Sequence, residues 1–172
     1  MEKKIIEIYT DGSCRGNGKE NSSGGFGVTA LYSQMDRPFV DYTFGEQCVN
    51  TTNNREELKA LIHALELSQT KYKDCLCYIY SDSAYVVNMC AEWIWSWYSR
   101  GWLRAGNKPI ENLDLVKQIY SYLTIEFNNF TIRKVKGHND VLGNEIADAL
   151  ATNDTAKLAK IFKENDLGIV NV

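Results

Sequence analysis

Two short apolar runs, each followed by an aspartate, constrain the fold of this chain more than any other feature. Residues 5–10 precede Asp11, and residues 76–80 lie just before Asp82. Both runs have the length and apolar character of buried central strands. Between them, residues 55–68 repeat apolar side chains at helical spacing, so a crossover helix is expected to join two parallel neighbouring strands. Asp11 and Asp82 should therefore lie side by side.

The remaining segments predict an α/β fold. Two further strands are expected at residues 26–32 and 39–49, separated by a turn at 35–38, and a Gly-, Asn- and Ser-rich loop is expected over 11–25. Helices are predicted from Ser83 to about residue 89, over 113–123 and over 142–162, with a fifth strand at 130–135. The expected architecture is a five-stranded mixed sheet, made of a three-strand antiparallel meander plus two parallel strands, with helices on both faces.

Length and composition argue for one domain and a cytoplasmic location. A chain of 172 residues suits a single α/β domain, which we place at residues 1–155, with 156–172 as a partly frayed C-terminal helical extension of it. No apolar run approaches the roughly 20 residues that span a bilayer, and the N-terminus lacks a signal-peptide pattern. Because the first strand begins so early, no separate N-terminal binding module is expected. Five cysteines without framework spacing indicate reduced thiols.

Four acidic residues occupy positions where an isolated carboxylate would be costly. They are Asp11, Glu57, Asp82 and Asp148, at strand ends or on apolar helix faces. Oxygen ligands of this kind suit Mg²⁺ or Mn²⁺, and a divalent ion would relieve both repulsion and desolvation. A net charge of −3 argues weakly against binding nucleic acid through bulk charge, but bound ions would offset it, so charge leaves the partner open.

Each acid also has an ordinary interpretation when it is taken alone. Asp11 and Asp82 could be turn or cap residues, and Asp148 could pair with a lysine in the core. Glu57 could simply favour the helix dipole. Helical geometry places Glu57 with Leu61 on the inward face, so the adjacent Glu56 is expected to be solvated.

Longer strings around these acids resemble type 1 ribonuclease H. They are YTDGSCRGNG (9–18), TTNNREEL (51–58), YSDSAYV (80–86), VKGH (135–138) and GNEIADALA (143–151), in the order of the family's motifs. Residues 97–102 and 107–109 look like the family's basic protrusion. The resemblance covers nearly the whole chain, from about residue 3 to 153.

The resemblance implies a ribonuclease H-like fold and a specific chemistry. It implies that the chain is a metal-dependent endonuclease that hydrolyses the RNA strand of RNA–DNA hybrids, leaving 5′-phosphate and 3′-hydroxyl ends. Two Mg²⁺ ions are implied, with Mn²⁺ as an alternative. Asp11 would bridge both ions, Asp148 would hold the ion that activates water, and Glu57 and Asp82 would support the other. His138 would assist proton transfer or product departure, although a structural role in its loop stays open.

Substrate contacts are implied at two places. Cys14, Asn17, Asn53 and Asn54 fall where the family contacts the minor groove, and neutral donors and acceptors there suit recognition of the 2′-hydroxyl. In the protrusion, the candidate residues are Trp97, Arg100, Trp102, Arg104 and Lys108, which include fewer cations than the richest family members carry. The expected partner is an RNA–DNA hybrid, with no membrane, and the expected state is a monomer.

Two other functions remain as alternatives. The first is a catalytically silent hybrid-binding domain with the same fold. The second is the ribonuclease H domain of a reverse transcriptase or mobile element. The complete set of four acids with His138 argues against the silent domain, and a cleavage assay with Mg²⁺ would decide.

Overall fold

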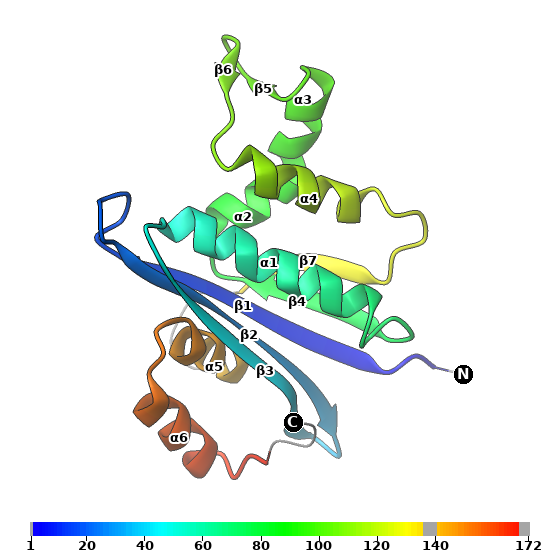
Figure 1. Cartoon of the computed structure of the whole chain (residues 1–172). Coiled ribbons are helices and arrows are strands. Elements are labelled where there is room, and N and C mark those ends of the chain that lie inside the picture. The colour runs from blue at the N-terminus through cyan, green and yellow to red at the C-terminus, as the bar shows by residue number, and fades with distance from the viewer. Residues whose placement is uncertain (1, 136–140, 169–172) are drawn as a thin grey trace.

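The computed structural model describes residues 2–135 and 141–168, and a five-stranded mixed sheet forms its centre (Figure 1). Strands β1 and β2 pair antiparallel, as do β2 and β3, whereas β4 runs parallel to both β1 and β7. The order across the sheet is β3-β2-β1-β4-β7. The fold class predicted from the sequence is confirmed. The strands are β1 (Ile5–Arg15), β2 (Ser23–Gln34), β3 (Arg37–Val49), β4 (Leu76–Ser81) and β7 (Phe130–Lys134).

Helices cover both faces of the sheet. In Figure 1, α1 and α4 lie on one side of it and α5 and α6 on the other. Within the described residues, no helix combines the length and apolar character that a membrane crossing requires. The helices are α1 (Asn53–Gln69), α2 (Ala84–Asn88), a π-helical turn (Met89–Trp93), α3 (Ile94–Ser99), α4 (Leu113–Leu123), α5 (Leu142–Ala151) and α6 (Thr155–Glu164).

The first three strands are longer than the sequence predicts. Residues 11–15 and 23–25, expected in a loop, continue the β1–β2 pairing until Arg15 meets Ser23. This ladder depends on backbone groups, so the Gly- and Ser-rich segment can extend it. At the other end, Met35 and Asp36 both have positive φ and form a two-residue hairpin turn, so β3 begins at Arg37.

The predicted helix over residues 142–162 is two helices. Just after α5, Asn153 takes a left-handed conformation with φ of 53°, so the chain cannot continue as the same helix. Asp154 then caps α6, because its carboxylate accepts a hydrogen bond from the Lys157 backbone N–H at 2.9 Å. Residues 152–154 (Thr-Asn-Asp) therefore end one helix and begin the next. The apolar periodicity does not reveal this break, because it continues from α5 into α6.

The sheet separates two apolar cores. Ile6, Ile8 and Leu61 lie fully buried between β1 and α1, whereas Tyr9 packs with Ile146 between β1 and α5. Alternation along the strand therefore places Asp11 on the face of Tyr9, which is the face that α5 covers.

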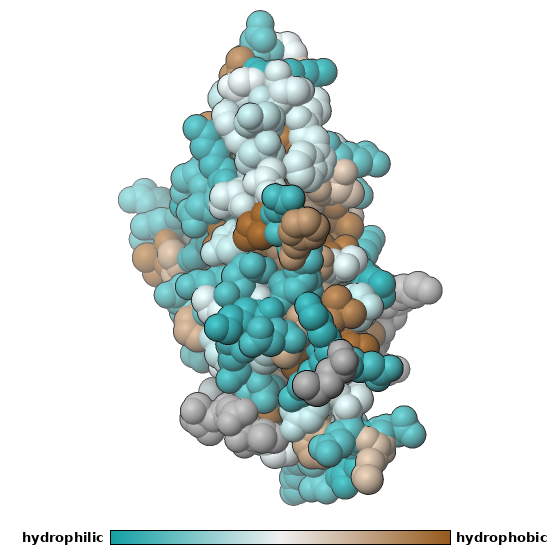
Figure 2. Space-filling model, turned by 90° about the vertical axis from the view of Figure 1, so that its right-hand side faces the viewer, coloured by the Kyte–Doolittle hydropathy of each residue, from teal (hydrophilic) through white to brown (hydrophobic). Residues whose placement is uncertain are grey.

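A protrusion of aromatic residues forms one end of the molecule. It comprises α3 and the hairpin of β5 (Leu103–Arg104) and β6 (Lys108–Pro109), at the top of Figure 1. Tyr98, Trp102 and Tyr120 contact one another there, with ring centroids 4.6–5.7 Å apart. Figure 2 shows this end as mostly pale, of intermediate hydropathy, above a more hydrophilic body.

Candidate metal centre

Three acids from separate elements converge at one point. Asp11 lies in β1, Glu57 in the second turn of α1, and Asp82 directly after β4. Each offers a carboxylate oxygen, and these oxygens all lie within 4.8 Å of one another. Asp11 and Glu57 are buried, whereas Asp82 is exposed. The structure therefore brings three of the four predicted acids together at one point.

The end of β4 and the absence of a side chain at Gly12 make this approach possible. β4 pairs with β1 only as far as Thr10 opposite Ser81, so the sheet is open beside Asp11. A Cβ atom on Gly12 would overlap the backbone of Glu56 and Glu57. Glycine therefore lets α1 lie against β1 closely enough for the Glu57 carboxylate to reach the site.

The three carboxylates are electrostatically frustrated. Burial raises the pKa of Asp11 far above its usual range, and the charges of Glu57 and Asp82 raise it further. Burial and the Asp82 charge also raise the pKa of Glu57, against a hydrogen bond from the Gly12 backbone. Asp82 is exposed as a whole residue, but partial burial of its carboxylate is the main cause that raises its pKa. For all three carboxylates, the hydrogen bonds present do not fully compensate the cost of the charged form.

A divalent cation fits this donor set. One carboxylate oxygen of Glu57, Oε2, is buried without a hydrogen-bond partner. Oxygen ligands at this spacing match the preference of Mg²⁺ and Mn²⁺, and an ion among them would stabilise the charged carboxylates and so offset the burial and repulsion that raise their pKa values. Asp11, Glu57 and Asp82 could therefore hold a metal ion together.

Asp148 lies next to this group but has a different partner. Its charge contributes to the raised pKa values of Asp11 and Asp82, which places it at the same site. Its Oδ2 atom accepts a hydrogen bond from Lys157 Nζ at 2.6 Å, and the two groups form an ion pair. One turn earlier on α5, Asn144 also contributes to the pKa of Asp82 through a hydrogen bond, and its own Oδ1 is buried without a partner.

Glu56 corrects one prediction. Its side chain is fully buried rather than solvated. Its Oε1 accepts hydrogen bonds from Thr51 Oγ1 at 2.8 Å and from Lys59 Nζ at 3.0 Å, whereas its Oε2 has no partner. The physical reason is that β2 covers the start of α1, since Gly24 lies close to the Glu56 side chain. The ion pair with Lys59 offsets this burial.

The residues predicted to contact the minor groove gather at the start of α1. Asn17 Oδ1 accepts a hydrogen bond from the Asn53 backbone N–H at 2.7 Å, which joins the β1–β2 loop to the helix. Cys14 Sγ lies 3.3 Å from the Thr51 carbonyl oxygen. Asn53 and Asn54 are exposed. Two segments that are distant in sequence therefore form one polar surface at the start of α1, the helix that carries Glu57.

The protrusion brings its predicted residues together only in part. Arg104 and Lys108 are paired residues of the β5–β6 hairpin, and both are exposed. Arg100 follows α3 and is exposed as well. Trp97 and Trp102, in contrast, are partly buried against the apolar core, so much of their area serves packing. His138 lies outside the described residues.

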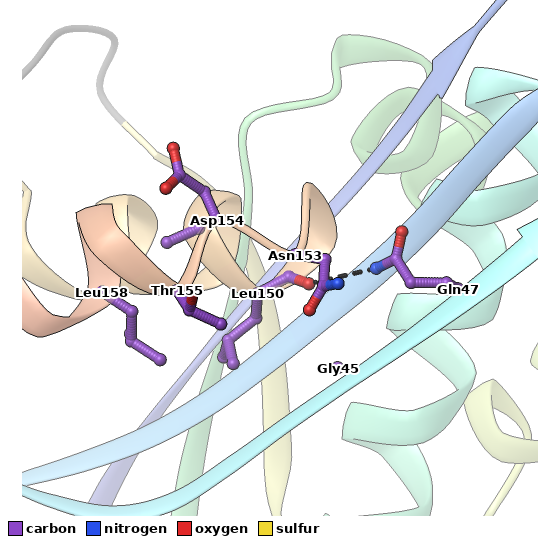
Figure 3. A pocket seen from close by; sticks show the side chains of 8 residues that line it. Gly45, Gln47, Leu150, Asn153, Asp154, Thr155 and Leu158 are labelled. Carbon is purple, nitrogen blue, oxygen red and sulfur yellow. Dashed lines mark hydrogen bonds between the residues drawn. The ribbon is translucent and has the colours of Figure 1, made fainter.

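A cavity at the turn between α5 and α6 lies apart from the acids. It has a volume of about 150 Å³, and Gly45, Gln47 and Leu150 line it together with residues of the turn (Figure 3). The dashed line in Figure 3 is the hydrogen bond from Gln47 Nε2 to the Leu150 carbonyl. None of the four acids lines this cavity.

Sequence reasoning missed two contributors to the site. Lys157 follows Asp148 by nine residues across a helix break, so no helical period connects them. The sequence indicates that Asp148 could pair with a lysine, but it does not indicate which lysine. The signal for Gly12 was available, since a glycine next to a candidate ligand in a strand indicates close approach of another backbone.

The chain is similar in sequence to proteins of known family. A model of the RNase H family matches residues 3–156. The chain is 44% identical over 152 residues to the ribonuclease H of Prosthecochloris aestuarii, and this covers 88% of the chain and 94% of that protein. It is 37% identical over 163 residues to the ribonuclease H of Caldanaerobacter subterraneus, which covers 94% of the chain and 96% of that protein.

Solved structures agree. LC9-RNase H1, a type 1 RNase H with the type 2 active-site motif, matches with a TM-score of 0.73 and 29% identity, over 91% of this chain and 74% of that one. The PFV RNase H domain matches with a TM-score of 0.72 and 23% identity, over 91% and 96%, and this likeness shows the fold alone. With the sequence matches they confirm the resemblance drawn from the motifs, and the chain belongs to the RNase H family.

Proposed function

We propose that this chain is a metal-dependent endonuclease that hydrolyses the RNA strand of RNA–DNA hybrids. The observation that carries the proposal is the convergence of Asp11, Glu57 and Asp82, with Asp148 beside them, in a member of this family. Water attacks phosphorus, the bond from phosphorus to the 3′-oxygen breaks, and the products carry 5′-phosphate and 3′-hydroxyl ends.

Two divalent ions are assigned to the four acids. Asp11, Glu57 and Asp82 would hold one ion, and Asp148, together with Asp11, would hold the other. When bound, such a pair stabilises the attacking and leaving oxygens of an in-line displacement. The role of the protein is to fix these carboxylates before substrate arrives. The close packing of α1 on β1 at Gly12 and the cover of α5 over β1 support that role.

Recognition of the hybrid is assigned to two surfaces. Cys14, Asn17, Asn53 and Asn54 offer neutral polar groups beside the acids, which suits contact with 2′-hydroxyl groups in a minor groove. In the protrusion, Arg100, Arg104 and Lys108 are exposed cations suited to phosphates, and the exposed parts of the partly buried Trp97 and Trp102 are assigned to substrate contact as well. His138 is assigned to proton transfer, because an imidazole can both accept and donate a proton.

The preferred ion, the cellular location and the oligomeric state are assigned as well. Mg²⁺ is the preferred ion, and Mn²⁺ can replace it, because both are hard cations that take oxygen ligands. The chain acts as a cytoplasmic monomer. Five cysteines without a disulfide among them support a reducing location. Residues 156–168 are assigned to the catalytic domain as its helical extension, and the last part of the predicted extension, 169–172, lies outside the described residues.

The test is a cleavage assay with a labelled RNA strand in three contexts: a hybrid with DNA, a duplex with RNA, and single-stranded RNA. We expect Mg²⁺-dependent cleavage of the hybrid alone, and its loss with EDTA or in Asp11→Asn. Pure wild-type protein that binds the hybrid without cutting it would favour the silent binding domain. Cleavage that survives in Asp11→Asn would refute the assigned site.

A further inference from the structure

Lys157 is the one cation that contacts the candidate metal ligands in the part of the chain that the structure describes. Its Nζ lies 2.6 Å from Asp148 Oδ2, and none of the other ion pairs involves Asp11, Glu57 or Asp82. Neither side chain of this pair is deeply buried, since their exposed fractions are 38% and 43%. The ammonium group therefore occupies a carboxylate oxygen that would otherwise be available to bind a metal ion at Asp148.

The fold holds Lys157 in this place. Its backbone N–H donates to Asp154, the cap of α6, at 2.9 Å, so the residue is fixed in the first turn of that helix. α6 in turn packs beside α5, which carries Asp148 (Figure 1). The surroundings are acidic, since the carboxylates of Asp148, Glu145 and Asp154 all interact with the Lys157 ammonium group.

We propose that Lys157 competes with the metal ion for Asp148 and so sets the metal concentration at which the enzyme becomes active. The inference rests on the proposed function, because it requires Asp148 to be a metal ligand. In the metal-free protein the ammonium group compensates the Asp148 carboxylate. When a divalent ion binds at Asp148, the flexible lysine side chain swings into solvent, which its partial exposure permits.

The strength of the pair suits competition rather than blockade. A partly exposed ion pair contributes up to about 1 kcal/mol, which corresponds to about a fivefold change in an equilibrium constant. A divalent ion with several carboxylate ligands outweighs this. Lys157 should therefore raise the midpoint of the metal titration without lowering the rate at saturating metal, which makes it a positioning residue rather than a catalytic one.

The test compares Lys157→Gln, Lys157→Arg and the control Lys160→Gln. Lys160 lies on the same helix, is more exposed and pairs with Glu164 at 3.8 Å, away from the acids. Two midpoints are measured: the Mg²⁺ concentration for half-maximal hybrid cleavage, and Mn²⁺ binding to the protein alone by isothermal titration calorimetry.

We expect Lys157→Gln to lower both midpoints by about two- to fivefold, and to leave the saturated rate within about twofold. Lys157→Arg, which keeps the charge, and Lys160→Gln should behave as wild type. If wild type cleaves the hybrid but Lys157→Gln leaves either midpoint unchanged, or lowers the saturated rate, the inference is overturned and the proposed function stands. A wild-type protein that neither cleaves the hybrid nor binds Mn²⁺ would overturn both.

Discussion

Asp11 concentrates the electrostatic cost of this site in one residue. Its carboxylate is buried, two further carboxylates lie within 4.8 Å, and Asp148 adds a third charge. Such an arrangement is destabilising unless a proton or a cation compensates it. Stability and function are therefore opposed at this residue, as they are at many ligand sites built before the ligand binds.

The first prediction concerns the stability of Asp11→Asn without metal. Folding raises the pKa values of Asp11 and Glu57, so at a given pH above about 4 the folded chain binds more protons than the unfolded chain. Wild-type stability in EDTA should therefore fall as the pH rises from about 4 through the raised pKa values. Asp11→Asn should lack much of this fall and melt about 2–8 °C above wild type at pH 8.5, equivalent to about 1–2 kcal/mol.

Calorimetry in EDTA at pH 5.5 and 8.5 measures the effect. The control is Asp74→Asn, which neutralises an exposed acid outside the site. The gap between Asp11→Asn and wild type should widen with pH, and saturating Mg²⁺ should close it. A gap that is constant with pH would mean that the raised pKa values have no part in it.

The second prediction separates the adjacent glutamates. Glu57→Gln should reduce cleavage by at least about a hundredfold, because it removes a charge from the candidate metal centre. Glu56→Gln should keep the rate at saturating metal within about threefold, since Glu56 faces Thr51 and Lys59. It should instead lose about 1–2 kcal/mol of stability, because the mostly buried Lys59 side chain is left without its partner charge. Urea unfolding and initial rates are the measurements, and the reverse pattern would exchange the two roles.

At the residue scale, the sequence predicted which acids converge but not how each is compensated. Spacing and order placed Asp11, Glu57 and Asp82 together, because strand and helix periods fix directions. The burial of Glu56 depends on β2, a strand folded over the helix from elsewhere in the chain. The pairing of Lys157 with Asp148 depends on the angle between two helices. Neither is a local property.

The packing of α1 on β1 is the element contact on which the site depends. The helix carries Glu57 and the polar surface of Asn53 and Asn54, and the strand carries Asp11. Gly12 is the point where the two backbones come closest. A side chain at residue 12 would push α1 away from β1 and would displace the Glu57 carboxylate together with the polar groups of Asn53 and Asn54.

Gly12→Ala should therefore reduce kcat by about a hundredfold, as expected for a shift of about 1 Å in a catalytic group. It should also weaken Mn²⁺ binding, because Glu57 is displaced from Asp11. Rates and calorimetric binding are measured at a temperature where circular dichroism shows the variant folded. Gly168→Ala is the control, since a Cβ atom there meets nothing within 4 Å. Normal binding and turnover in Gly12→Ala would show that α1 can shift without cost to the site.

Elements were predicted well where side-chain periodicity decides and less well where backbone pairing or caps decide. α4 was predicted with its observed bounds, because its apolar stripe is regular. β1 and β2 extend through Gly- and Ser-rich residues that carry no strand signal. The break before α6 depends on Asn153 and Asp154, two residues whose cap chemistry competes with a continuing apolar pattern. The boundary of the helical extension at residue 155 stays a prediction.

For the whole molecule, the distribution of charge matters more than its sum. A net charge of −3 would repel a polyanion, yet the acids gather at the candidate metal centre and exposed cations stand on the protrusion. The same apolar core packs against the strand and helix that carry the acids and against Trp97 and Trp102 of the protrusion. Hybrid binding should therefore depend on a few phosphate contacts. The rest of the affinity should come from the uncharged polar groups around Asn17, Asn53 and Asn54.

The last prediction is that hybrid affinity depends only moderately on salt. Each phosphate contact contributes about −0.7 to −0.9 to the slope of log affinity against log salt, so three protrusion cations account for about −2 to −3. We expect a wild-type slope shallower than about −5, measured with Ca²⁺ in place of Mg²⁺ to prevent cleavage. Neutralising Arg100, Arg104 and Lys108 should bring the slope close to zero. Neutralising Lys160 and Lys163 on α6, far from the protrusion in Figure 1, should leave it unchanged. A slope that responds to α6 and not to the protrusion would place the hybrid on the opposite face of the sheet.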